Sequence, residues 1–385
     1  MSLSHSRARV AVTVVFALNG ALFASIFSRL PAIQERAGIG DGALGLALLC
    51  SMVGLLVAQV GAGALVTRVG SRHLVLVGVL GYAAGLVPVS LSRSFVALAA
   101  SLALVGLCNG VLDVSMNLHG LTVERGLQRP ILSSLHAAFS LGALAGAAVG
   151  GIVAGAGVGV VPHLWTAAAF GTAVGLAAVR FLLPPSADAA PEGPLFARPT
   201  RALAAIGIFA FCVLLSEGAV NDWVAVYLED DLGTGEGLAA AGLAVFSLTM
   251  GVGRLAGDRL TEALGPVRLA RSGAGLAALG MVTALAGTEP AMAIAGFAAM
   301  GLGLAAMFPL ALRAAATRSA TPGPAVAAVS AVGYCGFLAG PTSVGGLSEL
   351  AGLRTALLLV AILCATAAAL APVVRAPVTM DLKSR

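Results

Sequence analysis

The sequence predicts an all-α integral membrane protein, with twelve transmembrane helices in two pseudo-symmetric six-helix bundles. Three observations predict this class: few charged residues, twelve long apolar runs and an internal repeat. Only 10% of the 385 residues are charged and 59% are hydrophobic, whereas a soluble domain carries about 25% charged residues. Most of the surface must therefore face lipid. The net charge of +5 is spread through short loops, so we expect no nucleic-acid partner.

Each apolar run is long enough for a transmembrane helix, which needs about 20 residues. The runs are apolar on all sides, and they lack the alternation of a membrane β-barrel. The 50 glycines suit close contacts between membrane helices. In order, the predicted helices cover 8–30, 42–65, 74–92, 96–120, 131–154, 163–183, 201–228, 238–256, 267–287, 290–315, 325–348 and 353–374.

The basic residues predict the orientation, because cytosolic loops of membrane proteins are rich in Lys and Arg. With the N-terminus inside, all but four of the 22 basic residues fall in cytosolic loops or tails. The exceptions are Arg29, Arg36, Arg93 and Arg354. We therefore expect a multi-pass protein of the cytoplasmic membrane with both termini in the cytosol. The first apolar run ends without a small-residue cleavage site, so we interpret it as a helix and not as a signal peptide.

An internal repeat divides the chain near its middle. Thr67-Arg68, after the second predicted helix, corresponds to Asp258-Arg259 after the eighth. The glycine spacing of the fifth helix, from Gly142 to Gly151, recurs in the eleventh, from Gly336 to Gly346. We predict an N-terminal bundle over 1–183, a cytosolic linker over 184–200 and a C-terminal bundle over 201–385. Two six-helix halves that rock about a central site are a known transporter design.

With these features the chain resembles the major facilitator superfamily over essentially its full length. The loop between helices 2 and 3 in that superfamily reads Gly-x3-Asp-Arg-x-Gly-x-Arg. Here Thr67 replaces the acidic residue, while the second copy keeps Asp258. The resemblance implies transport by alternating access, with a small-molecule substrate and no enzymatic activity.

A narrower resemblance, over 106–146, is to the fucose-permease-type proton symporters. In that group a carboxylate on helix 4, followed four residues later by Asn, helps to couple protons to sugar. The resemblance places this role on Asp113 and Asn117, with His136 where the group carries a polar amide. The group also has a carboxylate on helix 1, where this sequence offers only Asn19.

In the first half, Asn109, Asp113 and Asn117 follow helical spacing and form one polar stripe. An ionised carboxylate within a bilayer costs about 3 kcal/mol even on lenient scales, so Asp113 should face a cavity or a partner. We expect Asp113 to take up and release a proton, with His136 as its partner or relay. Asn109, Asn117 and Asn19 are candidate substrate contacts. A purely structural hydrogen-bond network between helices is the alternative.

In the second half, Glu217 is a candidate second proton site, and Asn221 lies on the same helix face. Asn221 and Asp222 are candidate substrate contacts. The alternative is a buried acid paired with a neighbouring helix.

The charged residues at the repeated helix ends are candidate gating residues. We expect a charge-pair latch at the cytosolic end, or simple anchoring by the positive-inside rule. The residues are Arg68, Arg72, Arg254, Asp258 and Arg259.

These features predict a secondary active transporter of a small polar organic solute, driven by proton symport. The glycine-rich fifth helix leaves open a proton-antiport exporter of drugs or amphipathic metabolites. A receptor or scaffold without transport is the third possibility. The sequence lacks nucleotide-binding, zinc-protease and Cys-x-x-Cys motifs. We expect no cofactor, no metal and a monomer in the bilayer.

Overall fold

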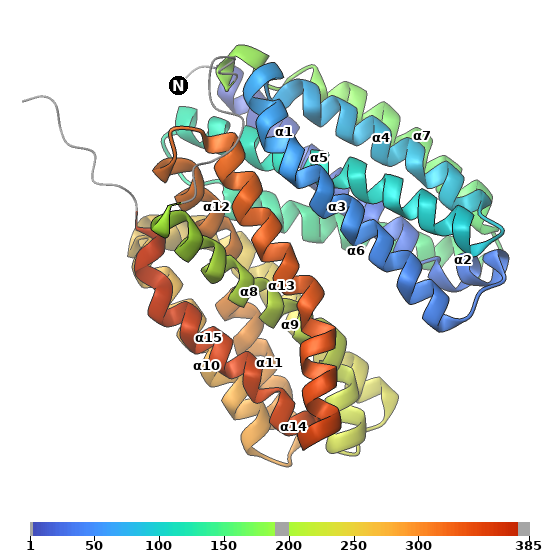
Figure 1. The fold of residues 1–385 in the computed structure, drawn as a ribbon, viewed down its shortest axis with the longest axis vertical. Helices are drawn as coiled ribbons and strands as arrows, with labels where there is room; N and C mark the ends of the chain where they lie inside the picture. The colour runs from blue at the N-terminus through green and yellow to red at the C-terminus, as the bar shows by residue number, and fades with distance from the viewer. Residues whose placement is uncertain (1–2, 189–199, 376–385) are drawn as a thin grey trace, which may run out of the picture. The chain divides into compact units, whose positions relative to one another are not determined.

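The computed structural model describes residues 3–188 and 200–375 (Figure 1). Contacts divide the chain into two compact units, Met1–Phe196 and Ala197–Arg385. The division falls inside the predicted linker, of which residues 189–199 lie outside the described part.

Within its described residues, the first unit contains seven α-helices and one 3₁₀ turn. Its core is formed by their apolar faces, with Phe16, Tyr82 and Leu112 fully buried. The helices are α1 (Leu3–Phe27), α2 (Leu30–Ala37), α3 (Asp41–Val69), α4 (Ser71–Leu91), α5 (Phe95–Leu127), α6 (Leu132–Gly155) and α7 (Val160–Val179), followed by the turn η1 (Pro185–Ala187).

The second unit repeats this plan with more interruptions. Phe209, Phe246 and Phe297 lie in its core. Its elements are α8 (Arg201–Val226), the π-turn η2 (Tyr227–Asp231), α9 (Glu236–Leu264), α10 (Pro266–Ala286), α11 (Pro290–Leu304), α12 (Met307–Arg318), α13 (Pro322–Ala351), α14 (Leu353–Ala356), α15 (Leu358–Leu370) and the 3₁₀ turn η3 (Ala371–Val374).

Within the described residues, twelve helical segments are long and apolar enough to cross a membrane, and no strand is present. The predicted fold class is therefore confirmed. Two details differ from the expected runs. The short helix α2 follows the first span, because its Pro31 lies in the first turn, where a missing N–H is tolerated. The tenth span breaks between α11 and α12, because Pro309 cannot donate to the carbonyl four residues earlier.

The same helix pairs form in each unit. In the first unit α1 packs on α6, α3 on α5, and α4 on both α5 and α7. In the second, α8 packs on α13, α9 on α11, and α10 on both α11 and α15. The repeat seen in the sequence is therefore also a repeat of helix packing.

Small residues make these pairs close. A side chain at Gly106 of α5 would collide with the carbonyl of Ser51 in α3, and one at Gly301 of α11 with the carbonyl of Phe246 in α9. The two contacts occupy corresponding places in the two units. Backbones this close require glycine, as in other membrane helix pairs.

The repeated motif after the second span is a helix end. Helix α3 continues to Val69, and Gly70 separates it from α4 with φ of 81°. In the second unit Gly265 separates α9 from α10 with φ of 77°. Positive φ favours glycine at both positions, so the motif produces a sharp reversal between two spans.

Candidate functional site

Asp113 lies in the interior of the first unit, on α5, and its side chain is only 5% exposed. Gln59 of α3 donates from Nε2 to Asp113 Oδ2 at 3.2 Å. Asn117, one turn along α5, donates from Nδ2 to Asp113 Oδ1 at 3.2 Å and to the Asp113 carbonyl at 2.9 Å. Both carboxylate oxygens therefore accept an amide N–H, which compensates part of the cost of burial.

A third helix joins this group through Asn117. The ring of His136, on α6, contacts Asn117 Oδ1 through Nε2 at 3.1 Å. Because the amide oxygen can only accept, Nε2 carries the proton. His136 also lies edge-on to Phe16 of α1, with ring centroids 5.3 Å apart. The predicted residues Asp113, Asn117 and His136 thus form one hydrogen-bonded chain, in which Asn117 stands between the acid and the imidazole.

Three buried amide oxygens near this chain have no hydrogen-bond partner within the described part of the structure: those of Asn19, Gln59 and Asn109. Asn19 uses its nitrogen for a long contact with the sulfur of Met116, at 3.8 Å. An unpaired buried acceptor costs about 1–3 kcal/mol. Such oxygens can accept hydrogen bonds from the N–H or O–H groups of a solute, and the chain therefore has unused hydrogen-bonding capacity.

Glu217 forms an ion pair inside the second unit. Arg254 Nη2 lies 3.2 Å from Glu217 Oε1, and the two side chains are 14% and 15% exposed. Sequence reasoning placed Arg254 with the helix-end charges, but it lies well inside α9, where its long side chain reaches α8. An ion pair at this depth in a span is expensive to build and is typical of a functional site.

The other two candidates beside Glu217 point in different directions. Asn221 donates from Nδ2 to the Glu217 carbonyl at 2.9 Å, so it is partly used inside α8. Asp222 is exposed. The structure brings Glu217, Asn221 and Arg254 together, and it leaves Asp222 outside this group.

The remaining gating candidates lie at the ends of α3, α4 and α9. Arg68 and Arg259 are exposed, Arg72 is partly exposed, and Asp258 is only 9% exposed. Their role as a latch stays a prediction.

Sequence reasoning missed a second buried polar network, at the start of α4. His119 of α5 accepts from the backbone N–H of Leu183 at Nε2 (3.2 Å) and contacts Ser71 Oγ through Nδ1 at 2.7 Å. Ser71 donates from its hydroxyl to Asp188 Oδ2 and from its backbone N–H to Asp188 Oδ1, at 3.0 Å. Asp188 thus holds the first residues of the linker against α4.

Gln59, His119 and Asp188 were not predicted, although a signal existed for two of them. Gln59 and His119 are polar residues inside apolar runs, and both are almost completely buried. Asp188 gave no signal, because it is one acid in a polar segment.

Among the described residues, no group of three or more His, Cys, Asp or Glu is arranged to hold a metal ion.

The fold and the buried charges define a class of protein: a polytopic membrane transporter built from two similar six-span units. The family model for the Major Facilitator Superfamily matches this chain twice, over residues 12–209 and 206–383. The chain belongs to this superfamily. It is a transporter, not an enzyme.

Relatives and solved structures agree with this assignment. The chain is 32% identical over 364 residues to an uncharacterized MFS-type transporter of Yersinia pestis, covering 94% of each. It is 31% identical to the membrane protein MosC of Rhizobium meliloti over 357 residues, covering 91% of this chain and 86% of that protein.

Two solved transporters share the fold at low identity. The crystal structure of the E. coli fucose:proton symporter FucP aligns with a TM-score of 0.76 at 16% identity, over 97% of this chain and all (100%) of that one. The human organic anion transporter MFSD10 aligns with a TM-score of 0.78 at 17% identity, over 96% of this chain and 100% of that one.

Proposed function

We propose that this protein is a proton-coupled symporter that moves a small polar organic solute across the cytoplasmic membrane by alternating access, with both termini in the cytosol. The observation that carries the proposal is Asp113, a carboxylate buried among amide groups inside a span. Such a residue is costly unless it serves ion or substrate movement.

The geometry supports a role for Asp113 as the proton site. Gln59 and Asn117 stabilise the ionised carboxylate through their N–H groups. After protonation the carboxyl group becomes a donor, and rotation of the Gln59 amide would present its unpaired oxygen to it. The Gln59 side chain can therefore form a hydrogen bond with Asp113 in both its ionised and its protonated form.

His136 has a positioning role in this proposal. An amide does not pass protons along a chain as an imidazole does, so Asn117 interrupts a relay from His136 to Asp113. The imidazole instead fixes the orientation of Asn117, which keeps the amide N–H directed at the carboxylate. Asn19 and Asn109, with their unpaired oxygens, are the proposed solute contacts in this unit.

Glu217 and Arg254 form the proposed second site, with Asn221 beside them. Their ion pair is partly exposed, so polar groups of a solute can compete for either partner. Protonation of Glu217 would release the guanidinium, which links proton binding to solute binding in this unit. Arg68, Arg72, Asp258 and Arg259 remain the proposed gating residues.

The test has two steps. A thermal-shift screen of metabolites first identifies a solute that stabilises the purified protein. The protein is then placed in liposomes that contain a pH-sensitive dye. Adding that solute outside should acidify the lumen, since protons enter with it. Asp113→Asn and Glu217→Gln should each reduce this solute-driven proton entry at least tenfold, roughly the effect of 1.4 kcal/mol. Glu349→Gln, at an exposed carboxylate, is the matched control.

The sign of the proton flux separates symport from the second candidate, a proton-antiport exporter. Antiport is favoured by one observation: Gly142 and Gly146 of α6 lie against the α1 backbone, at Ala17 and Ala21, a close helix contact that could serve as a hinge. An antiporter would alkalinise the lumen as solute enters. Unchanged coupling in both the Asp113 and the Glu217 variant would contradict either form of proton-driven transport.

A further inference from the structure

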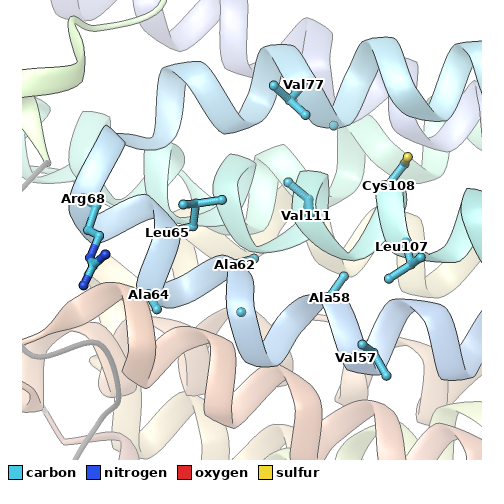
Figure 2. A pocket seen from close by; sticks show the side chains of 12 residues that line it. Val57, Ala58, Ala62, Ala64, Leu65, Arg68, Val77, Leu107, Cys108 and Val111 are labelled. Atoms are coloured by element: carbon cyan, nitrogen blue, oxygen red, sulfur yellow. The ribbon is translucent and has the colours of Figure 1, made fainter.

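A groove runs along the surface of the first unit, over α3, α4 and α5 (Figure 2). Its volume is about 520 Å³, within the range of small-molecule sites. Eleven of its twelve lining residues are Ala, Gly, Val, Leu or Cys, and the twelfth is Arg68. Figure 2 shows Arg68 at one end of the groove, on the last turn of α3.

The groove has the length of one membrane leaflet. Along α3 it extends from Val57, near the middle of that helix, to Arg68. At 1.5 Å per residue this is about 16 Å, and half of a bilayer core of about 30 Å is about 15 Å. The lining side chains of Val57, Leu65 and Val77 are 45–60% exposed, so the groove opens sideways from the helices. Its shape matches an acyl chain lying parallel to the spans.

The internal repeat explains why Arg68 is available for an anion. In the second unit the corresponding Arg259 directly follows the acidic Asp258, whereas Arg68 follows Thr67. The Thr67 hydroxyl donates to the Gly63 carbonyl, inside its own helix. Within the described residues, Arg68 makes no hydrogen bond or ion pair. The nearby acid Asp188 binds Ser71.

We propose that this groove binds an anionic phospholipid, with one acyl chain along α3 and the lipid phosphate on Arg68. Basic residues beside grooves between membrane helices recognise such headgroups. The orientation predicted from the basic residues puts Arg68 at the cytosolic side, where anionic lipids attract basic side chains. The groove does not include Asp113. It shares Arg68 with the proposed gating residues, but lipid binding can be measured without transport.

The test is native mass spectrometry of the full-length protein in detergent, titrated with dioleoylphosphatidylglycerol or dioleoylphosphatidylcholine. The wild type should retain phosphatidylglycerol more strongly. Arg68→Gln should weaken phosphatidylglycerol binding about fivefold, which corresponds to about 1 kcal/mol per basic residue near the membrane surface, and should leave phosphatidylcholine binding unchanged. Arg259→Gln, at the corresponding position of the second unit, is the matched control and should have little effect.

A second variant blocks the groove without disturbing the fold. A Cβ atom at Gly61 would meet nothing within 4 Å, and Gly61 lines the groove, so we expect the side chain of Gly61→Leu to extend into the groove. It should reduce the retention of both lipids, and its melting temperature in lipid-free detergent should be no lower than that of the wild type, since Leu has a higher helix propensity than Gly.

Five results would overturn the proposal. The first is equal retention of the two lipids by the wild type. The second is an equal loss in Arg68→Gln and Arg259→Gln. The third is unchanged lipid binding in Gly61→Leu. The fourth is a dimer of the wild type that Gly61→Leu disrupts, because a second copy of the protein would then occupy the groove in place of a lipid. Glycerol phosphate competing as well as the lipid would identify the site as one for free phosphate and would also overturn it.

Discussion

Buried polar side chains of this protein differ in how well they are paired. Gln59 is fully buried and donates to the Asp113 carboxylate, so its amide compensates for a buried acid. Ser330, in the second unit, is equally buried, yet its hydroxyl has no partner within the described residues. Two buried polar residues can therefore contribute with opposite sign to the stability of the fold.

Replacing Gln59 by Met should lower the free energy of unfolding by about 1–3 kcal/mol, because a buried carboxylate oxygen loses its donor. Ser330→Ala should be neutral or slightly stabilising, since it removes an unpaired hydroxyl. Thermal unfolding of the two variants in the same detergent measures the difference. Equal melting temperatures for both variants would contradict the assigned pairing.

The ion pair of the second unit gives another prediction at this scale. Arg254→Met should destabilise the protein by about 3 kcal/mol, because Glu217 would be left as an unpaired charge within the spans. The double variant Arg254→Met with Glu217→Gln should recover most of this loss, since no charge remains. A thermal-melt double-mutant cycle measures the coupling, and additive losses would show that the two side chains do not stabilise each other.

At the scale of the helices, stability depends on where a glycine faces another backbone. Gly142 of α6 lies against the carbonyl of Ala17 in α1, whereas Gly151, further along the same helix, has open space around it. Both are glycines in one membrane helix, so composition alone does not distinguish them. Only the first is required for the pairing of α1 with α6.

The substitution Gly142→Ala should cost about 1–3 kcal/mol, as overpacking of tight contacts generally does. Gly151→Ala should gain up to about 1 kcal/mol from the higher helix propensity of Ala. The melting temperatures of the two variants should therefore move in opposite directions. A loss of similar size in both would mean that helix packing at Gly142 is looser than described.

For the whole molecule, the start of the linker adds a pH-dependent contribution to stability. Burial raises the pKa of the Asp188 carboxyl above its ordinary value, against the opposing hydrogen bonds from Ser71 and the charge of Arg125. The folded protein therefore binds this proton more tightly than the unfolded chain. The resulting stability is complete below the ordinary pKa of 3.8 and is lost as the pH rises through the raised pKa.

Asp188→Asn removes this titration and keeps an oxygen that can accept from Ser71. We expect the melting temperature of the wild type, relative to Asp188→Asn, to increase as the pH is lowered from 7 towards 4. The comparison needs only thermal melts of the two proteins across that range. A difference that stays constant, or that changes in the opposite direction, would contradict the raised pKa.

The architecture was predictable from sequence because apolar length and the distribution of Lys and Arg determine the number of spans directly. The repeated glycines also appear where two backbones meet. Partners across helices were harder to predict. Asp113 stands out as an acid in an apolar run, but nothing in the sequence connects it to Gln59 on another helix. Arg254 was grouped with its neighbours in sequence, whereas its long side chain pairs with Glu217 on α8.

The ring of His119 has a fixed tautomer. Since Nε2 accepts from the Leu183 amide, the hydrogen resides on Nδ1 and is directed at Ser71 Oγ, whose own hydrogen is directed at Asp188. The two ring nitrogens should therefore give well-separated ¹⁵N resonances of the less common Nδ1–H form. Specific isotope labelling of histidine would turn this ring into an internal spectroscopic reporter that signals when the start of the linker detaches from α4.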